Sequence, residues 1–173
     1  AFEAASIKCG VRAAAGAIET VKVVDGKLEI GTIDDAPAIG ICGSGLVDAV
    51  ACLVQIGVLD ASGKFNQVDD PNLVERDGEE IYMLTDDVFL SQRDVRELQF
   101  AKAAIATGWA LLAEEFGIED KDIQQVLLAG SFGSYLSPAS AVKIGLVPKI
   151  SVLRIVSAGN VAGEGAKMAL LST

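Results

Sequence analysis

The stretch Val126-Leu-Leu-Ala-Gly-Ser-Phe-Gly133 is the part of the sequence that decides the fold. Its first four residues form a short apolar run, which is typical of a strand buried in a sheet. Gly130 and Gly133 then allow a tight turn, because glycine adopts conformations that other residues avoid. Ser137-Pro138 follows, and this pair favours a helix start with Ser137 as the cap. A strand, a glycine turn and a helix are therefore predicted in that order.

The same alternation of helices and strands continues on both sides of this stretch. The apolar run 152–156 predicts a strand, and residues from about 160 to 171 predict a helix rich in small side chains. Upstream, Ser91 and Asp94 form a capping-box pattern. Apolar residues then recur at helical spacing up to Phe116, which predicts a helix of about seven turns with one buried stripe. Such alternation favours an α/β fold, with a sheet covered by helices.

The N-terminal half predicts a hairpin followed by a helix. Asp25-Gly26 separates two alternating runs, 17–24 and 27–33, and this dipeptide favours a two-residue hairpin turn. A second glycine turn, Gly43-Ser44-Gly45, precedes apolar residues at helical spacing up to position 57. Residues 60–80 are polar and acidic, and we expect a surface loop there.

Length and charge exclude several classes of protein. The chain has 173 residues, 51% of them hydrophobic, with 14 Lys and Arg against 24 Asp and Glu and a net charge of −10. This length predicts a single domain spanning 1–173. The acidic balance argues against a nucleic-acid partner, and no apolar run is long enough for a membrane span. The sequence has no His, which removes Ser–His and Cys–His catalysis and His-containing zinc sites.

The cysteines point to a reducing compartment. Cys9, Cys42 and Cys52 form no CxxC pair, which argues against a zinc or iron–sulfur site in this chain. An odd count without a signal peptide favours reduced thiols in the cytoplasm.

The two glycine turns are the candidate binding loops. At a helix start, free N–H groups and the helix dipole favour an anion, and glycines let a phosphate approach the backbone. The candidates are Gly43, Ser44, Gly45, Gly130, Ser131, Phe132 and Gly133. Neither turn is a Walker A loop or a full GxGxxG fingerprint. Tight turns that only pack a helix onto a strand remain the alternative for both.

Charged side chains give few further candidates. Lys102 lies at the edge of the stripe on the long helix, where it reaches either a nucleotide or water. Asp48 and Glu164 fall in the first turns of predicted helices, where they stabilise the helix dipole. No nucleophile, catalytic acid–base pair or metal site emerges from the sequence.

At this point the sequence resembles a known family, the reductive activators of corrinoid proteins, over nearly the whole chain. The stretches that carry the resemblance are Phe2-Glu3, 7–19, 40–48, 92–103, 128–133, 144–148 and 159–166. Their order and spacing are similar to those of the C-terminal ATPase domain of that family.

The resemblance implies a ribonuclease-H-like lobe of the actin and sugar-kinase superfamily, with a mixed sheet flanked by helices and ATP bound with Mg²⁺ between two lobes. Whole family members also carry a [2Fe-2S] domain and use ATP hydrolysis to restore Co(I) in a corrinoid protein. Residues 127–133 resemble the adenosine motif, and 157–166 resemble the second connecting motif. Lys102 lies where relatives have a helix near the adenine. The implied partner is a corrinoid protein or a corrinoid-dependent methyltransferase.

The first phosphate motif and most of the second are absent from this sequence, and Ala1–Glu3 resembles only the tail of the second. We therefore expect a C-terminal lobe fragment of a larger ATPase, without meaningful ATPase activity on its own, because positioning acids supply most of phosphoryl-transfer catalysis. Two alternatives stay open. One is a non-catalytic module for homodimerisation or for docking the corrinoid partner, and the weaker one is a lobe of a small-molecule kinase.

Overall fold

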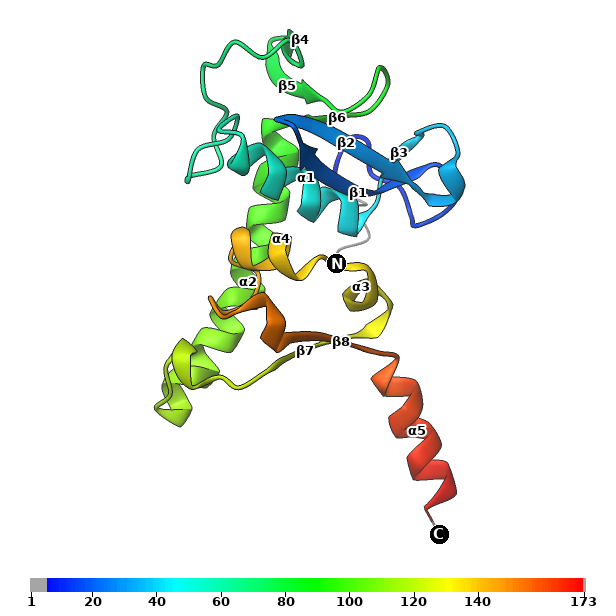
Figure 1. The fold of residues 1–173 in the computed structure, drawn as a ribbon, viewed down its shortest axis with the longest axis vertical. Helices are drawn as coiled ribbons and strands as arrows, with labels where there is room; N and C mark the ends of the chain where they lie inside the picture. Colours follow the sequence, from blue (N-terminus) through cyan, green and yellow to red (C-terminus); the bar gives the residue numbers. More distant parts are fainter. Residues whose placement is uncertain (1–5, 173) are drawn as a thin grey trace.

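The computed structural model of the chain describes residues 6–172. Helix α1 (Gly43–Gln55) packs against the N-terminal hairpin, and the parallel strand pair of the C-terminal part lies apart from it, beyond the short helices 130–135 and 138–143 (Figure 1). The predicted α/β class and the N-terminal hairpin are confirmed. The strands are divided among three sheets in the described part of the chain.

The first sheet is built on the predicted hairpin. β1 (Ala17–Val24) pairs antiparallel with β2 (Lys27–Thr32), and the short β3 (Gly40–Ile41) lies parallel to β1. Asp25 and Gly26 have φ values of 48° and 77°. A type I′ turn requires positive φ at both central residues, which explains why this dipeptide marks the hairpin.

Helix α1 forms the centre of the core. Its first eleven residues, 43–53, are all buried. Gly45 lies so close to β1 that a Cβ atom at this position would overlap the carbonyl group of Ile18. The predicted glycine turn is therefore the first turn of the helix itself, and Gly45 serves packing.

Side chains of α1 close the edge of β1 that faces away from β2. The backbone N–H of Val21 donates a hydrogen bond to Oδ2 of Asp48 at 3.4 Å, and the Cys52 thiol donates to the carbonyl oxygen of Val21 at 3.3 Å. An open strand edge would otherwise present these groups to another chain. Asp48 thus has a structural role that its position in the sequence did not indicate.

The region 60–80 differs from the loop that its composition predicts. β4 (Leu73–Arg76) pairs with β5 (Glu79–Met83), which pairs with β6 (Phe89–Ser91). Asp77 and Gly78 both have positive φ and form the turn between the first two strands. The acidic composition gave no sign of β4, because the side chains of this strand face mostly solvent.

Helix α2 (Gln92–Phe116) has the predicted ends but not the predicted buried stripe. Ser91 and Asp94 form the capping box, and Gly117 ends the helix in the left-handed region with φ of 64°. Val95 and Leu98 are buried, whereas Leu112 is 60% exposed and Phe116 is 76% exposed. Toward its end the helix lies at the edge of the molecule, where Trp109 is still partly buried but the last residues of the stripe face solvent (Figure 1).

The C-terminal part contains a parallel pair, β7 (Val126–Ala129) and β8 (Ile155–Gly159). Two short helices, α3 (Gly130–Tyr135) and α4 (Pro138–Lys143), lie between them in the chain. The Ser137 cap and Pro138 start of α4 are confirmed. Two expectations were wrong: the predicted turn 130–133 is helical, and the strand expected from 152 begins at 155 after a 3₁₀ turn.

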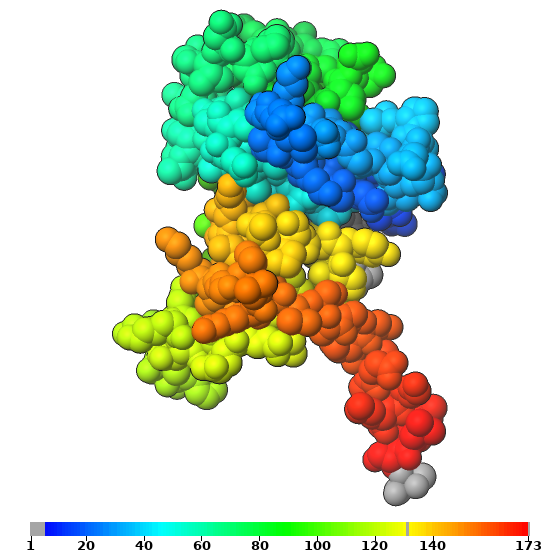
Figure 2. All heavy atoms as spheres, in the orientation of Figure 1, coloured from blue at the N-terminus to red at the C-terminus, as the bar shows by residue number. Residues whose placement is uncertain are grey.

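Helix α5 (Val161–Leu171) projects away from the rest of the molecule, and none of its residues is buried (Figures 1 and 2). Its predicted extent is confirmed. Between residues 6 and 172, no helix combines the length and the apolar character that a bilayer span requires.

Candidate functional site

The structure brings parts of both predicted binding loops to one hollow. This hollow has a volume of about 790 Å³ and is lined by residues from five separate segments of the chain. The lining residues are Val11, Arg12, Ala13, Glu19, Ile33, Cys42, Gly43, Ser44, Phe132 and Tyr135. Small-molecule sites commonly have volumes of ~300–1,000 Å³ and mostly apolar walls with a few polar groups. The hollow therefore has the size and the chemistry of a ligand site.

The first loop contributes the start of α1. Gly43 and Ser44 line the hollow directly after Cys42, which is the N-terminal cap residue. The Cys42 thiol lies 3.3 Å from the carbonyl oxygen of Ile18 and 3.4 Å from Oγ of Ser44. These contacts fix the cap against β1, so the helix start forms a rigid part of the wall.

The second loop contributes side chains rather than glycines. Phe132 and Tyr135 of α3 line the hollow. Gly130 has φ of 85°, which starts the helix in a conformation that favours glycine. A Cβ atom at Gly133 would come within 2.9 Å of the carbonyl carbon of Leu128, so this glycine lets α3 pack on β7.

Lys102 lies away from the hollow. Its side-chain end sits beside Gly145, in the turn that follows α4, and it is not among the lining residues. A nucleotide contact for Lys102 stays a prediction. Ala1–Glu3, which resemble the tail of a phosphate motif, lie outside the described residues.

Two charged lining residues were missed by sequence reasoning. Arg12 and Glu19 are 7 positions apart and belong to the N-terminal segment and to β1. Both fall in the stretch 7–19 that carries the family resemblance, but neither stands in a glycine turn and no local pattern gives either residue a role. Residues 11–13 are held against β3 by the hydrogen bond from Val11 N–H to the Ile41 carbonyl at 3.0 Å, which brings Arg12 to the hollow. The pairing of β1 with β3 places Glu19 there.

The described residues do not form a metal centre by themselves. Between residues 6 and 172, no group of three or more Cys, Asp or Glu side chains is placed to hold an ion. Asp48 is buried, and the loss of water around it raises the pKa of its carboxyl group above the ordinary value. This buried carboxyl closes the edge of β1 and does not line the hollow.

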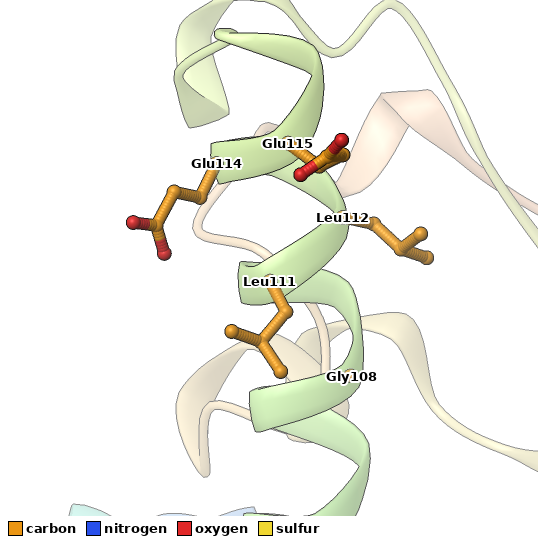
Figure 3. A pocket seen from close by; sticks show the side chains of 5 residues that line it. All are labelled: Gly108, Leu111, Leu112, Glu114 and Glu115. Atoms are coloured by element: carbon orange, nitrogen blue, oxygen red, sulfur yellow. The ribbon is translucent and has the colours of Figure 1, made fainter.

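A second hollow lies on the far end of α2 and has a volume of about 730 Å³. Its lining side chains, Leu111, Leu112, Glu114 and Glu115, all come from one helix and point in different directions (Figure 3). No group of polar side chains converges there, so this surface offers nothing that would orient a small ligand.

The comparisons with known proteins identify the family of the chain. A family model described as the C-terminal domain of RACo, the ASKHA domain, matches residues 1–173. The chain belongs to this family. A solved structure titled reductive activator for corrinoid, iron-sulfur protein is similar to this RACo-type domain, with a TM-score of 0.87 and 35% identity over 99% of this chain.

Curated relatives of the RACo-type domain are similar over nearly its whole length. One is the corrinoid activation enzyme RamQ of Eubacterium limosum, with 37% identity over 188 residues. Another is the [Co(II) methylated amine-specific corrinoid protein] reductase of Methanosarcina barkeri, with 28% identity over 182 residues. The matches cover 99% and 92% of this chain but 32% and 31% of those proteins, so the chain spans about a third of their length.

Proposed function

We propose that the chain is the nucleotide-binding C-terminal lobe of an ATP-dependent reductive activator that restores Co(I) in a corrinoid protein. One observation carries this proposal: the hollow joins Gly43 and Ser44 to Phe132, which lies 88 positions further along the chain than Ser44. Both predicted loops thus contribute residues to the wall of the same hollow. The corrinoid partner is proposed from the names of the relatives. A corrinoid-dependent methyltransferase is the alternative partner.

ATP fits the hollow by size and by chemistry. The volume suits a nucleotide, Tyr135 offers a ring that is 68% exposed, and Arg12 offers a cation for phosphate. We propose that Gly43, Ser44 and Phe132, which line the hollow, form the protein side of this site, and that Gly130 contributes through the positive φ with which α3 begins. The remaining candidates, Gly45, Ser131, Gly133 and Lys102, belong to the same proposal, Gly45 and Gly133 through the packing that shapes the walls.

Magnesium would need ligands beyond those of this chain. One carboxylate, Glu19, lines the hollow, and Mg²⁺ usually binds one or two carboxylates together with the substrate phosphates and water. We therefore expect Mg²⁺ to enter with the nucleotide. Because the acids that position the attacking water are not in this set, we expect the chain alone to bind ATP without hydrolysing it.

Thermal unfolding of the chain with ADP or ATP and Mg²⁺ tests nucleotide binding. A ligand that binds only the folded chain stabilises it by RT ln(1 + [L]/Kd), so the melting temperature should rise with nucleotide concentration. Phosphate release by the pure chain should stay at background. An unchanged melting temperature at millimolar nucleotide would contradict the proposal, and Mg²⁺-dependent hydrolysis would contradict the expected inactivity.

The reductive step is tested with the complete protein that contains this chain. The absorbance spectrum of the corrinoid protein distinguishes Co(II) from Co(I), and formation of Co(I) should require ATP and an electron donor. ATP-independent reduction would separate this protein from the proposed activity.

Exposed apolar side chains favour a second candidate function. Leu111, Leu112 and Phe116 on α2, together with Leu170 and Leu171 on α5, are all more than half exposed. These surfaces suit a module that dimerises or docks a protein partner. A chain that self-associates or binds the corrinoid protein, with no melting shift on nucleotide addition, would favour this function over nucleotide binding. A small-molecule kinase lobe is favoured by the fold alone and by no further observation.

A further inference from the structure

The guanidinium group of Arg12 is an unpaired cation in an acidic protein. Arg12 is exposed and lines the hollow, and within residues 6–172 its side chain makes no hydrogen bond or ion pair. The chain carries 24 acidic residues against 14 basic ones, so carboxylates are plentiful. A cation that stays free in this setting is available to an external anion.

Glu19 gives the hollow an opposing charge. It lines the same cavity, is only partly exposed and has no ion-pair partner in the part of the chain that the structure describes. In particular, no ion pair joins Glu19 to Arg12. One positive and one negative group therefore share a cavity of about 790 Å³ without neutralising each other.

Arginine is suited to phosphate recognition by its shape. Its planar guanidinium group donates two parallel hydrogen bonds to phosphate oxygens, which a lysine ammonium cannot reproduce. The adjacent wall is formed by the buried Gly43 and Ser44, which bring no negative charge. An anionic group can therefore approach Arg12 without meeting another acid except Glu19 among the lining residues.

We propose that Arg12 binds a phosphate group of the ligand in this hollow and that Glu19 lowers the affinity for any anion held there. This inference rests on the proposed function only in taking the natural ligand to be a nucleotide. The phosphate recognition itself can be measured without a nucleotide, with pyrophosphate as the probe.

The experiment is a calorimetric titration of the chain with pyrophosphate in magnesium-free buffer at low salt, for wild type and four variants. Arg12→Gln should raise the Kd about tenfold, as expected for loss of a charge-assisted hydrogen bond. Arg12→Lys should recover only part of the loss, and Glu19→Gln should lower the Kd. Arg93→Gln is the matched control, because Arg93 is exposed on α2 and does not line the hollow.

The outcomes separate this inference from the proposed function. No pyrophosphate binding by wild type, or an equal effect of Arg12→Gln and Arg93→Gln, overturns the inference. If Arg12→Gln does not fold, Glu19→Gln decides, since an unchanged or higher Kd in that variant also overturns it. Arg12-dependent pyrophosphate binding without any binding of ATP or ADP would leave the inference standing and remove the proposed function. Nucleotide binding that does not depend on Arg12 would leave the proposed function standing and remove the inference.

Discussion

The backbone N–H of Lys8 donates a hydrogen bond to Oδ1 of Asp94, 3.0 Å away and 86 positions further along the chain. The other carboxylate oxygen of Asp94 accepts from the N–H of Ser91 at 2.9 Å and from its hydroxyl group at 2.8 Å. Lys8 is held a second time, by an ion pair between its ammonium group and Glu79. One buried carboxylate therefore caps α2 and fixes the N-terminal segment that leads to Arg12.

Asp94→Ala should lower the free energy of unfolding by about 3 kcal/mol or more, because each buried donor left without an acceptor costs about 1–3 kcal/mol. Urea unfolding followed by circular dichroism measures this loss. Asp60→Ala is the matched control, since Oδ1 of Asp60 also accepts three bonds, from Ser62 N–H, Ser62 Oγ and Lys64 N–H, but at an exposed site. The control should lose much less, and equal losses would show that burial is not the cause.

Asp48→Asn should stabilise the chain at neutral pH, because the amide keeps an oxygen that can accept from Val21 N–H but carries no charge that burial would penalise. Burial raises the pKa of Asp48, and the Ser140 hydroxyl, the Val21 N–H and Lys22 only partly oppose this effect. A raised carboxyl pKa means that the folded state holds the proton more tightly, so the contribution of Asp48 to stability is present at low pH. It is lost as pH rises from the unfolded pKa through the higher folded pKa.

Unfolding free energies of wild type and Asp48→Asn, measured from pH 3 to 7, test this sign. The difference between the two should be small at the acid end and grow with pH in favour of the variant. A variant that is less stable by a constant amount across the range would show instead that the charged carboxylate is needed at the edge of β1.

Tyr82 should titrate well above an ordinary tyrosine. Its ring is buried, and the loss of water raises the pKa of the phenol to about 12. Absorbance at 295 nm should show this late transition, and Tyr82→Phe should remove it. Since the folded state retains the proton, stability from this group falls as pH rises from about 10 through 12. A single transition near pH 10 that accounts for both tyrosines would contradict the buried phenol.

Gly45→Ala should lower the free energy of unfolding by about 1–3 kcal/mol, because the added methyl group would overlap the carbonyl of Ile18 and force α1 away from β1. Gly108→Ala is a matched substitution in the exposed half of α2, where a Cβ atom meets nothing within 4 Å. Alanine there should stabilise the chain by about 0.5–1 kcal/mol through helix propensity. Effects of the same sign for both variants would contradict the close approach at Gly45.

Local signals predicted the elements of this fold better than its long-range contacts. The Asp25-Gly26 turn, the Ser91 and Asp94 capping box and the Ser137-Pro138 start all act within four residues, and each appears in the structure. The buried stripe of α2 was wrong, because periodicity shows which face of a helix is apolar but not how far the body of the protein extends along it. Phe116 lies on the predicted face and is exposed.

The candidate site was predictable only in part for the same reason. Gly43 and Ser44 were found because glycine turns before helices have a sequence pattern, and the structure places both in the hollow. Arg12 and Glu19 reach the hollow through packing between segments far apart in sequence, and no local pattern marks such residues. Lys102 was named from its place on a helix face, and the structure turns it toward Gly145.

The two side-chain hydrogen bonds at Val21 disfavour association between chains through this edge of β1. A foreign strand that approached this edge of β1 would first have to displace Asp48 and Cys52 from the backbone groups that they occupy. The thiol keeps its hydrogen, because burial raises the pKa of Cys52 and leaves little of the reactive thiolate. We therefore expect this edge of β1 to stay closed without added reductant, so that self-association of the folded chain would proceed through other surfaces.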